Sequence, residues 1–226
     1  MSEEAGNDAV QAENVENYFS ADRAKAFVDA VVAIALTLLI LPLLDSLTEL
    51  TRPGGESEAS ASSWFAGNQF LLLSFLISFG VIAMFWINHH RMYARVRLVT
   101  TGLLWLNVAW LLTIVWLPVA TAMTNLPDGD DALVKVAYIG TMALTSLLGF
   151  CQDLFLSAHP RLHDITRIAL LRGMAVNLAM SILFVVSLIL SIVVPELSYY
   201  ALFLLGIAGL VARLLDRMLG VPQPAK

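Results

Sequence analysis

The chain of 226 residues is 58% hydrophobic and 14% charged, with a formal net charge of −5. An ordinary soluble domain is about half apolar and one quarter charged, so these proportions argue against a soluble globular protein and favour one embedded in lipid. Because one helical membrane span takes about 20 apolar residues, little of the chain is left for a separate catalytic domain.

The first 22 residues form an acidic segment with almost no apolar periodicity. Its acidic residues are Glu3, Glu4, Asp8, Glu13, Glu16 and Asp22. A segment of this composition cannot bury enough apolar surface to fold alone. We therefore predict a disordered tail over residues 1–22, a six-span transmembrane domain over 23–217 and a short C-terminal tail over 218–226.

Six long apolar runs follow the tail, and each can cross a bilayer as a helix. They lie at residues 27–47, 64–88, 99–120, 132–156, 168–194 and 197–215. Membrane β-strands would be about ten residues long and alternate in polarity, which these runs do not. The sequence therefore predicts an all-α polytopic membrane protein with six transmembrane helices.

Basic residues near the spans predict the orientation. With a cytoplasmic N-terminus, eleven Lys and Arg residues fall on the inside, and only Arg52 and Lys135 fall on the outside. Cytoplasmic loops of membrane proteins carry such an excess of basic residues. We expect an integral protein of a bacterial plasma membrane with both termini in the cytoplasm.

The start of the first run carries the most informative motif. It reads Arg23-Ala-Lys-Ala-Phe27-Val-Asp29 and leads into Ala-Ile-Ala-Leu-Thr-Leu-Leu at residues 33–39. This segment resembles the transmembrane protein 175 family of potassium channels, whose signature is an arginine, three variable residues and Phe-Ser-Asp. Val28 stands at the position of the signature serine. The resemblance continues at Trp86-Ile-Asn-His89, at Leu106-Asn107 and at Leu117-Pro118 with Thr121.

The resemblance implies a potassium-permeable cation channel, assembled as a homotetramer, with the pore lined by the first transmembrane helix. It also implies a structural network at the cytoplasmic end that ties the first two spans together. The network residues by this resemblance are Arg23, Phe27, Asp29, Trp86, His89 and Asn107. On spacing alone, Lys25 could instead pair with Asp29 one helical turn later.

Four residues of the first span follow i, i+3, i+4, i+7 spacing and share one helix face: Ile34, Thr37, Leu38 and Leu41. Spacing alone favours ordinary helix packing for such a stripe. The resemblance favours a pore face, with Ile34, Leu38 and Leu41 as a hydrophobic gate and Thr37 as a ring of hydroxyls for cation selectivity. The chain has no Thr-Val-Gly-Tyr-Gly-like carbonyl filter, and this absence agrees with the resemblance.

Other function classes find less support. A secondary or proton-coupled transporter is the main alternative, but it would normally place paired ionisable groups near the bilayer centre. No convergent catalytic cluster is evident, so we expect no enzyme, and no cofactor beyond potassium as the permeant ion.

The histidines do not indicate a metal site. His89-His90 and His159 with His163 lack acidic or cysteine partners at ligand spacing, so no metal site is expected. Topology accounts for the basic residues, so no nucleic-acid binding is expected.

Overall fold

The computed structural model describes residues 18–50, 60–194, 196 and 198–218, and it is almost entirely helical. Six helical segments are long and apolar enough to cross a membrane, and they span Ala21–Glu49, Gln69–Tyr93, Thr101–Met123, Ala132–Ala158, Arg167–Val193 and Tyr199–Met218. The all-α class and the number of spans are thereby confirmed.

The first span is two helices, α2 (Ala21–Leu38) and α3 (Leu41–Leu50), separated by a turn at residues 39 and 40. Pro42 explains the interruption, because proline has no N–H to donate to the carbonyl of Leu38 and its ring clashes with that carbonyl in a continuous helix. The uninterrupted span predicted from the apolar run is therefore wrong at this point.

The second and third spans are regular helices. The short helix α4 (Ala61–Gly67) begins with a capping box at Ser60, and α5 (Gln69–Tyr93) follows it directly. The third span, α6 (Thr101–Met123), begins where the Thr100 hydroxyl accepts a hydrogen bond from the backbone N–H of Leu103. A threonine in this capping position satisfies one of the free N–H groups of the first turn.

The second half of the chain departs from uniform α-helix in two places. The fourth span consists of α7 (Ala132–Lys135), one π-helical segment η1 (Val136–Gly140) and α8 (Thr141–Ala158). After the 3₁₀ turn η2 (Pro160–Leu162), the fifth span is the single helix α9 (Arg167–Val193). The sixth span joins a 3₁₀ segment, η3 (Ser198–Ile207), to α10 (Ala208–Met218).

A two-stranded antiparallel ribbon closes one end of the bundle. Strand β1 (Tyr18–Ser20) precedes α2 and pairs with β2 (Leu98–Thr100), which precedes α6. Residues 18–22 were expected in the disordered tail, and the structure instead places them in β1 and the start of α2. Residues 1–17 of that tail, and residues 219–226 of the C-terminal tail, lie outside the described residues.

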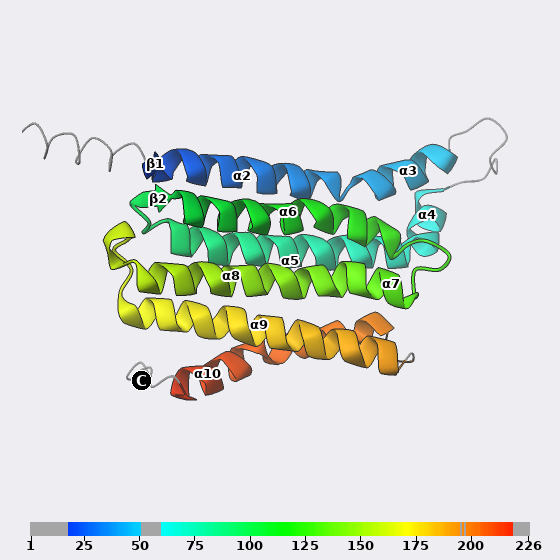
Figure 1. The fold of residues 1–226 in the computed structure, drawn as a ribbon. Coiled ribbons are helices and arrows are strands. Elements are labelled where there is room, and N and C mark those ends of the chain that lie inside the picture. The colour runs from blue at the N-terminus through cyan, green and yellow to red at the C-terminus, as the bar shows by residue number, and fades with distance from the viewer. Residues whose placement is uncertain (1–17, 51–59, 195, 197, 219–226) are drawn as a thin grey trace, which may run out of the picture.

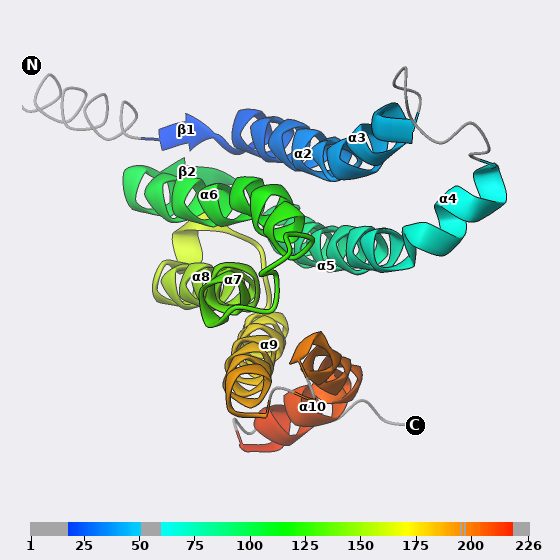
Figure 2. The same cartoon turned by 90° about the vertical axis from the view of Figure 1, so that its right-hand side faces the viewer.

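The helices lie side by side in a layered bundle (Figure 1). Figure 2 shows α2 at one edge and α9 with α10 at the other, with α6 and α8 between them. The main core lies between these layers and contains Val28 and Val32 of α2, while a smaller core beneath the ribbon contains Tyr93 and Leu156. The first and last described residues lie at the same end of the bundle (Figure 1), which we call the ribbon end.

Candidate functional site: the outer face of the first transmembrane helix

The two faces of α2 have opposite surroundings. Val28, Val32 and Ala35 are about 1% exposed and pack against α5 and α6, whereas Ile34 is 59% exposed and Thr37 is exposed as well. Residues spaced three and four apart share one side of a helix, so the buried and exposed sets fall on opposite sides. The described part of the subunit therefore leaves one continuous face of α2 uncovered.

Thr37 has its hydroxyl oriented by the backbone. Its Oγ1 donates a hydrogen bond to the carbonyl oxygen of Ile34 at 2.7 Å. A hydroxyl has one hydrogen and two lone pairs. Since the hydrogen is used within the helix, the oxygen presents lone pairs on the uncovered face, as a cation ligand would require.

The predicted stripe of four residues does not lie on one continuous helix. Ile34, Thr37 and Leu38 belong to α2, and Leu38 is 38% exposed. Leu41 is 49% exposed but begins α3, beyond the turn at residues 39 and 40. The i+7 relation that placed Leu41 on the stripe assumed an unbroken helix, and Pro42 was the signal in the sequence that could have corrected it.

At the ribbon end, Asp29 joins α2 to α5. The indole Nε1 of Trp86 donates a hydrogen bond to Oδ1 of Asp29 at 2.8 Å, and Nδ1 of His90 lies 3.5 Å from the same oxygen. The sequence placed Asp29 and Trp86 together through the family resemblance. His90 is an additional neighbour that the resemblance did not indicate.

His89 and Asn107 form a separate pair, between α5 and α6. Nε2 of His89 lies 2.9 Å from Oδ1 of Asn107, and both residues are buried. The imidazole is stacked between the rings of Tyr93 and Trp110, with centroid separations of 4.4 and 4.2 Å. The expected network is thus two local pairs, one at Asp29 and one at His89.

Two residues of the expected network lie outside these pairs. Arg23 is exposed and makes no hydrogen bond or ion pair with another described residue. Phe27 is 58% exposed on the outer side of α2. Lys25 was the alternative partner for Asp29 on spacing alone. Its Nζ instead lies 3.3 Å from Oδ1 of Asp22.

Sequence reasoning indicated that Asn177 and Asp153 bond between helices, but it did not identify the partners in the buried polar contacts of the other helices. Ser78 of α5 shares hydrogen bonds with the hydroxyls of Tyr138 and Thr121 at 2.7 and 2.9 Å. Asn177 of α9 donates a hydrogen bond to Asp153 of α8 at 2.8 Å. Polar side chains inside membrane helices commonly bond across helices, but the sequence does not say which pairs meet.

Residues 23–118 match the family model described as endosomal/lysosomal potassium channel TMEM175. The chain is similar to a potassium channel of Streptomyces collinus, with 36% identity over 101 residues that cover 45% of this chain and 46% of the relative. It is also similar to a potassium channel of a Chryseobacterium species, with 33% identity over 44% of this chain and 46% of the relative. A third relative is the mouse endosomal/lysosomal proton channel TMEM175, with 32% identity over 47% of this chain and 21% of the relative.

The matched part spans about half the length of the bacterial relatives, and all of these relatives are named as channels, not as enzymes. The fold is similar to the crystal structure of a TMEM175 homolog from Chamaesiphon minutus, with a TM-score of 0.59 at 19% identity over 88% of this chain and 97% of the other. A threonine-to-alanine variant of the potassium channel MtTMEM175 gives a TM-score of 0.60 at 17% identity over 88% of this chain and 93% of the other. The first half of the chain is thus similar in sequence to the TMEM175 family, and the whole chain has the six-span fold of the solved TMEM175 homologs.

Proposed function

We propose that the chain forms a potassium-permeable cation channel, with α2 lining the pore of a homotetramer. The uncovered face of α2 is the observation that carries this proposal, because a pore helix must pack inward on its own subunit and leave its other face for the axis. Small side chains at Ala26, Ala30 and Ala33 on that exposed face allow helices of neighbouring copies to approach closely. The names of the bacterial relatives support potassium as the permeant ion.

The chemistry of the face suits a gate and a coordination ring. Ile34, Leu38 and Leu41 would narrow the axis with branched apolar side chains, and such constrictions block ions by excluding water. Thr37 would add hydroxyl oxygens that replace part of the hydration shell of a cation. We assign the Asp29–Trp86 pair a structural role, because it holds α2 against α5.

A proton-coupled carrier finds less support in the placement of ionisable groups. Within the fourth span, Lys135 and Asp153 lie near opposite ends of the segment Ala132–Ala158 and not at its middle. Carriers normally bind their substrate and coupling ion near the bilayer midplane. Both termini are placed in the cytoplasm in this proposal, on the strength of the eleven-to-two distribution of basic residues.

The deciding experiment is ion flux through the purified protein in potassium-loaded liposomes and in planar bilayers. We expect unitary current steps, because a carrier turns over too slowly to give them. Potassium flux without resolvable unitary steps, at rates that saturate like an enzyme, would favour the carrier instead.

Thr37→Val tests the coordination ring. Valine keeps the shape and removes the oxygen, so we expect the potassium-to-sodium permeability ratio to fall by roughly fivefold, equivalent to losing about 1 kcal/mol of preferential coordination. Reversal potentials under biionic conditions measure this ratio. Thr141→Val is the matched control, because the Thr141 hydroxyl also donates to its own helix backbone but lies on α8. An unchanged ratio in Thr37→Val would remove Thr37 from the pore.

Ile34→Asn tests the gate. A polar side chain should wet the constriction and raise leak current by about tenfold, whereas Leu38→Ala and Leu41→Ala should raise it less. Leu36→Ala is the control. Leu36 lies on the same helix but is partly buried against the main core, so its truncation should mainly weaken packing. Equal leak from Leu36→Ala and Ile34→Asn in assembled protein would show that this face of α2 is not the pore.

A further inference from the structure

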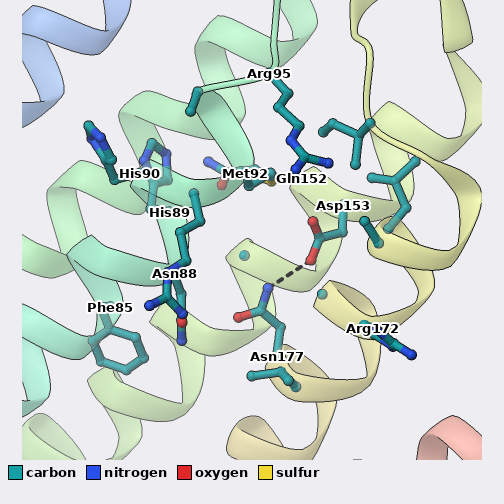
Figure 3. Close-up of a pocket in the computed structure, with 18 of the residues that line it drawn as sticks. Phe85, Asn88, His89, His90, Met92, Arg95, Gln152, Asp153, Arg172 and Asn177 are labelled. Carbon is teal, nitrogen blue, oxygen red and sulfur yellow. Dashed lines mark hydrogen bonds between the residues drawn. The ribbon is translucent and has the colours of Figure 1, made fainter. Parts of the chain in front are cut away.

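A cavity of about 600 Å³ with several polar lining residues lies near the ribbon end, between α5, α8 and α9. Figure 3 looks into it, with the α5 residues Asn88, His89 and His90 on one side and Arg172 of α9 on the other. Its size falls within the range of small-ligand sites. The roles proposed for the uncovered face of α2 do not use this cavity.

The inner wall of the cavity carries a buried carboxylate with an open oxygen. Asp153 is 3% exposed, and its Oδ2 accepts the hydrogen bond from Asn177 Nδ2. Neither Oδ1 of Asp153 nor Oδ1 of Asn177 has a protein partner among the described residues. Figure 3 shows these two side chains turned toward each other at the centre of the cavity. The wall therefore offers two hydrogen-bond acceptors, and a cation bound there would hold the Asp153 carboxyl in its charged form.

Two glycines make room for this pair. A Cβ atom built at Gly173 would lie 3.0 Å from a carboxylate oxygen of Asp153, and one built at Gly149 would lie 3.1 Å from Oδ1 of Asn177. Contacts this close would force the neighbouring side chain to shift. Glycine at both positions thus keeps the carboxylate and the amide where they are.

Gln152 provides an independent sign of a missing partner. It lines the same cavity and is 0% exposed, yet neither its Nε2 nor its Oε1 has a hydrogen-bond partner among the described residues. A buried amide with neither atom satisfied is rare in native proteins, because it loses its bonds to water without replacement. A polar ligand in the cavity would supply both a donor and an acceptor.

The exposed side of the lining, which we call the mouth, has the opposite charge. Arg91, Arg95 and Arg172 are exposed lining residues, whereas the buried Asp153 is the one acidic lining residue in the described chain. Figure 3 shows the Arg95 side chain extending toward the side where Gln152 and Asp153 lie. Arginine forks match the oxygens of phosphate groups. A fitting ligand therefore carries an anion at the mouth and a hydrogen-bonding cation at the inner wall.

We propose that this cavity binds a ligand in which a primary ammonium is joined to a phosphate, as in the headgroup of phosphatidylethanolamine. The ammonium donates to Asp153 and Asn177, and the phosphate meets Arg95. A lone inorganic anion would face the Asp153 carboxylate, and a lone metal cation would face three arginines. Val176, an exposed apolar residue on the membrane-spanning helix α9, is one of the lining residues, so the cavity borders the lipid-facing surface from which a lipid would enter.

The first test uses the unaltered protein, reconstituted in nanodiscs with equal amounts of competing lipids and analysed by native mass spectrometry for retained lipid. We expect phosphatidylethanolamine to be retained about tenfold over phosphatidylcholine, and its mono- and dimethyl derivatives to fall between them. Methylation keeps the charge and removes the N–H donors, so this order isolates the contact with Asp153. Equal retention of these lipids and of phosphatidylglycerol would overturn the proposal.

Matched variants assign the contacts. Asp153→Asn should abolish the preference for the primary ammonium, while Asp164→Asn should keep it, because Asp164 pairs with Arg97 outside the cavity. Arg95→Gln should weaken retention of every phospholipid by about tenfold, and Arg97→Gln should not. Unchanged retention in folded Asp153→Asn or Arg95→Gln would contradict the assigned contacts.

A third arm separates a lipid from a soluble ligand. Soluble phosphoethanolamine is titrated into detergent-purified, delipidated protein while thermal stability is recorded. Stabilisation that is lost in Asp153→Asn supports the same chemistry from a soluble source, whereas retention of the lipid alone assigns the site to the membrane. If potassium chloride or inorganic phosphate stabilises the protein as strongly as phosphoethanolamine does, the proposal that the cavity recognises an ammonium joined to a phosphate is wrong.

Discussion

Two carboxylates at the ribbon end accept hydrogen bonds of the same length in different surroundings. Asp29 accepts from Trp86 and Asp153 accepts from Asn177, both at 2.8 Å. The Asp29 side chain is 40% exposed, whereas Asp153 is 3% exposed. Water replaces a lost partner more readily at the first carboxylate than at the second. Access to water, and not bond length, should therefore decide what each bond contributes.

The two carboxylates also differ in their relation to the family. Asp29 and Trp86 lie within residues 23–118, which match the family model, and Asp153 and Asn177 lie beyond it. The first pair joins the proposed pore helix to its neighbour. The second pair joins α8 and α9 beside the cavity. This half of the chain lies outside the sequence match and resembles the solved TMEM175 homologs in fold.

Asn177→Leu should have the largest effect on stability. It leaves the buried Asp153 carboxylate without its donor, and we expect a loss of about 2–3 kcal/mol in the free energy of unfolding. Denaturant titration of the detergent-solubilised protein measures it. Gln69→Leu, an amide-to-leucine change at an exposed site, is the control. A loss no greater than that of the control would mean that water already reaches Asp153.

The double variant Asp153→Leu with Asn177→Leu sharpens this result. When both partners become apolar, no buried group is left unpaired, so most of the stability lost in Asn177→Leu should return. A double variant as unstable as the single one would show that packing, and not the orphaned carboxylate, causes the loss.

Trp86→Phe should cost less, about 1 kcal/mol or below. Phenylalanine keeps an aromatic ring beside His90 and removes only the indole N–H, and water can solvate the half-exposed Asp29. The same denaturant titration measures the change, together with the yield of assembled protein. A loss equal to that of Asn177→Leu would break the contrast between the two carboxylates.

Arg23→Gln should have the smallest effect, within about 0.5 kcal/mol. Its side chain is exposed and makes no hydrogen bond or ion pair in the described part of the subunit, and the effects of such surface changes on stability are usually small. If the variant unfolds normally but assembles poorly, Arg23 contacts another copy of the chain, and the family motif acts between subunits.

The sequence was sufficient for the features that repeat along the chain and insufficient for contacts across it. Six long apolar runs predicted six spans, and the family resemblance placed Asp29 beside Trp86. Pro42 was a local signal for the break in the first span, hidden within a continuous apolar run. The ribbon joins Tyr18 to Thr100, and nothing local to either residue indicates that pairing. Nor does spacing show that Asp153 faces Asn177 on the next helix.

The ribbon also determines how α2 can move. Backbone hydrogen bonds between β1 and β2 fix the N-terminal end of α2 to the N-terminal end of α6. An isolated β-bridge also joins Val96, between α5 and α6, to His163, between α8 and α9. The opposite end of α2 is freed from α3 by the turn before Pro42. The helix α2 is about 27 Å long and is held at its N-terminal end. A tilt of about 5° about that end would therefore displace its C-terminal end, at Thr37 and Leu38, by about 2 Å.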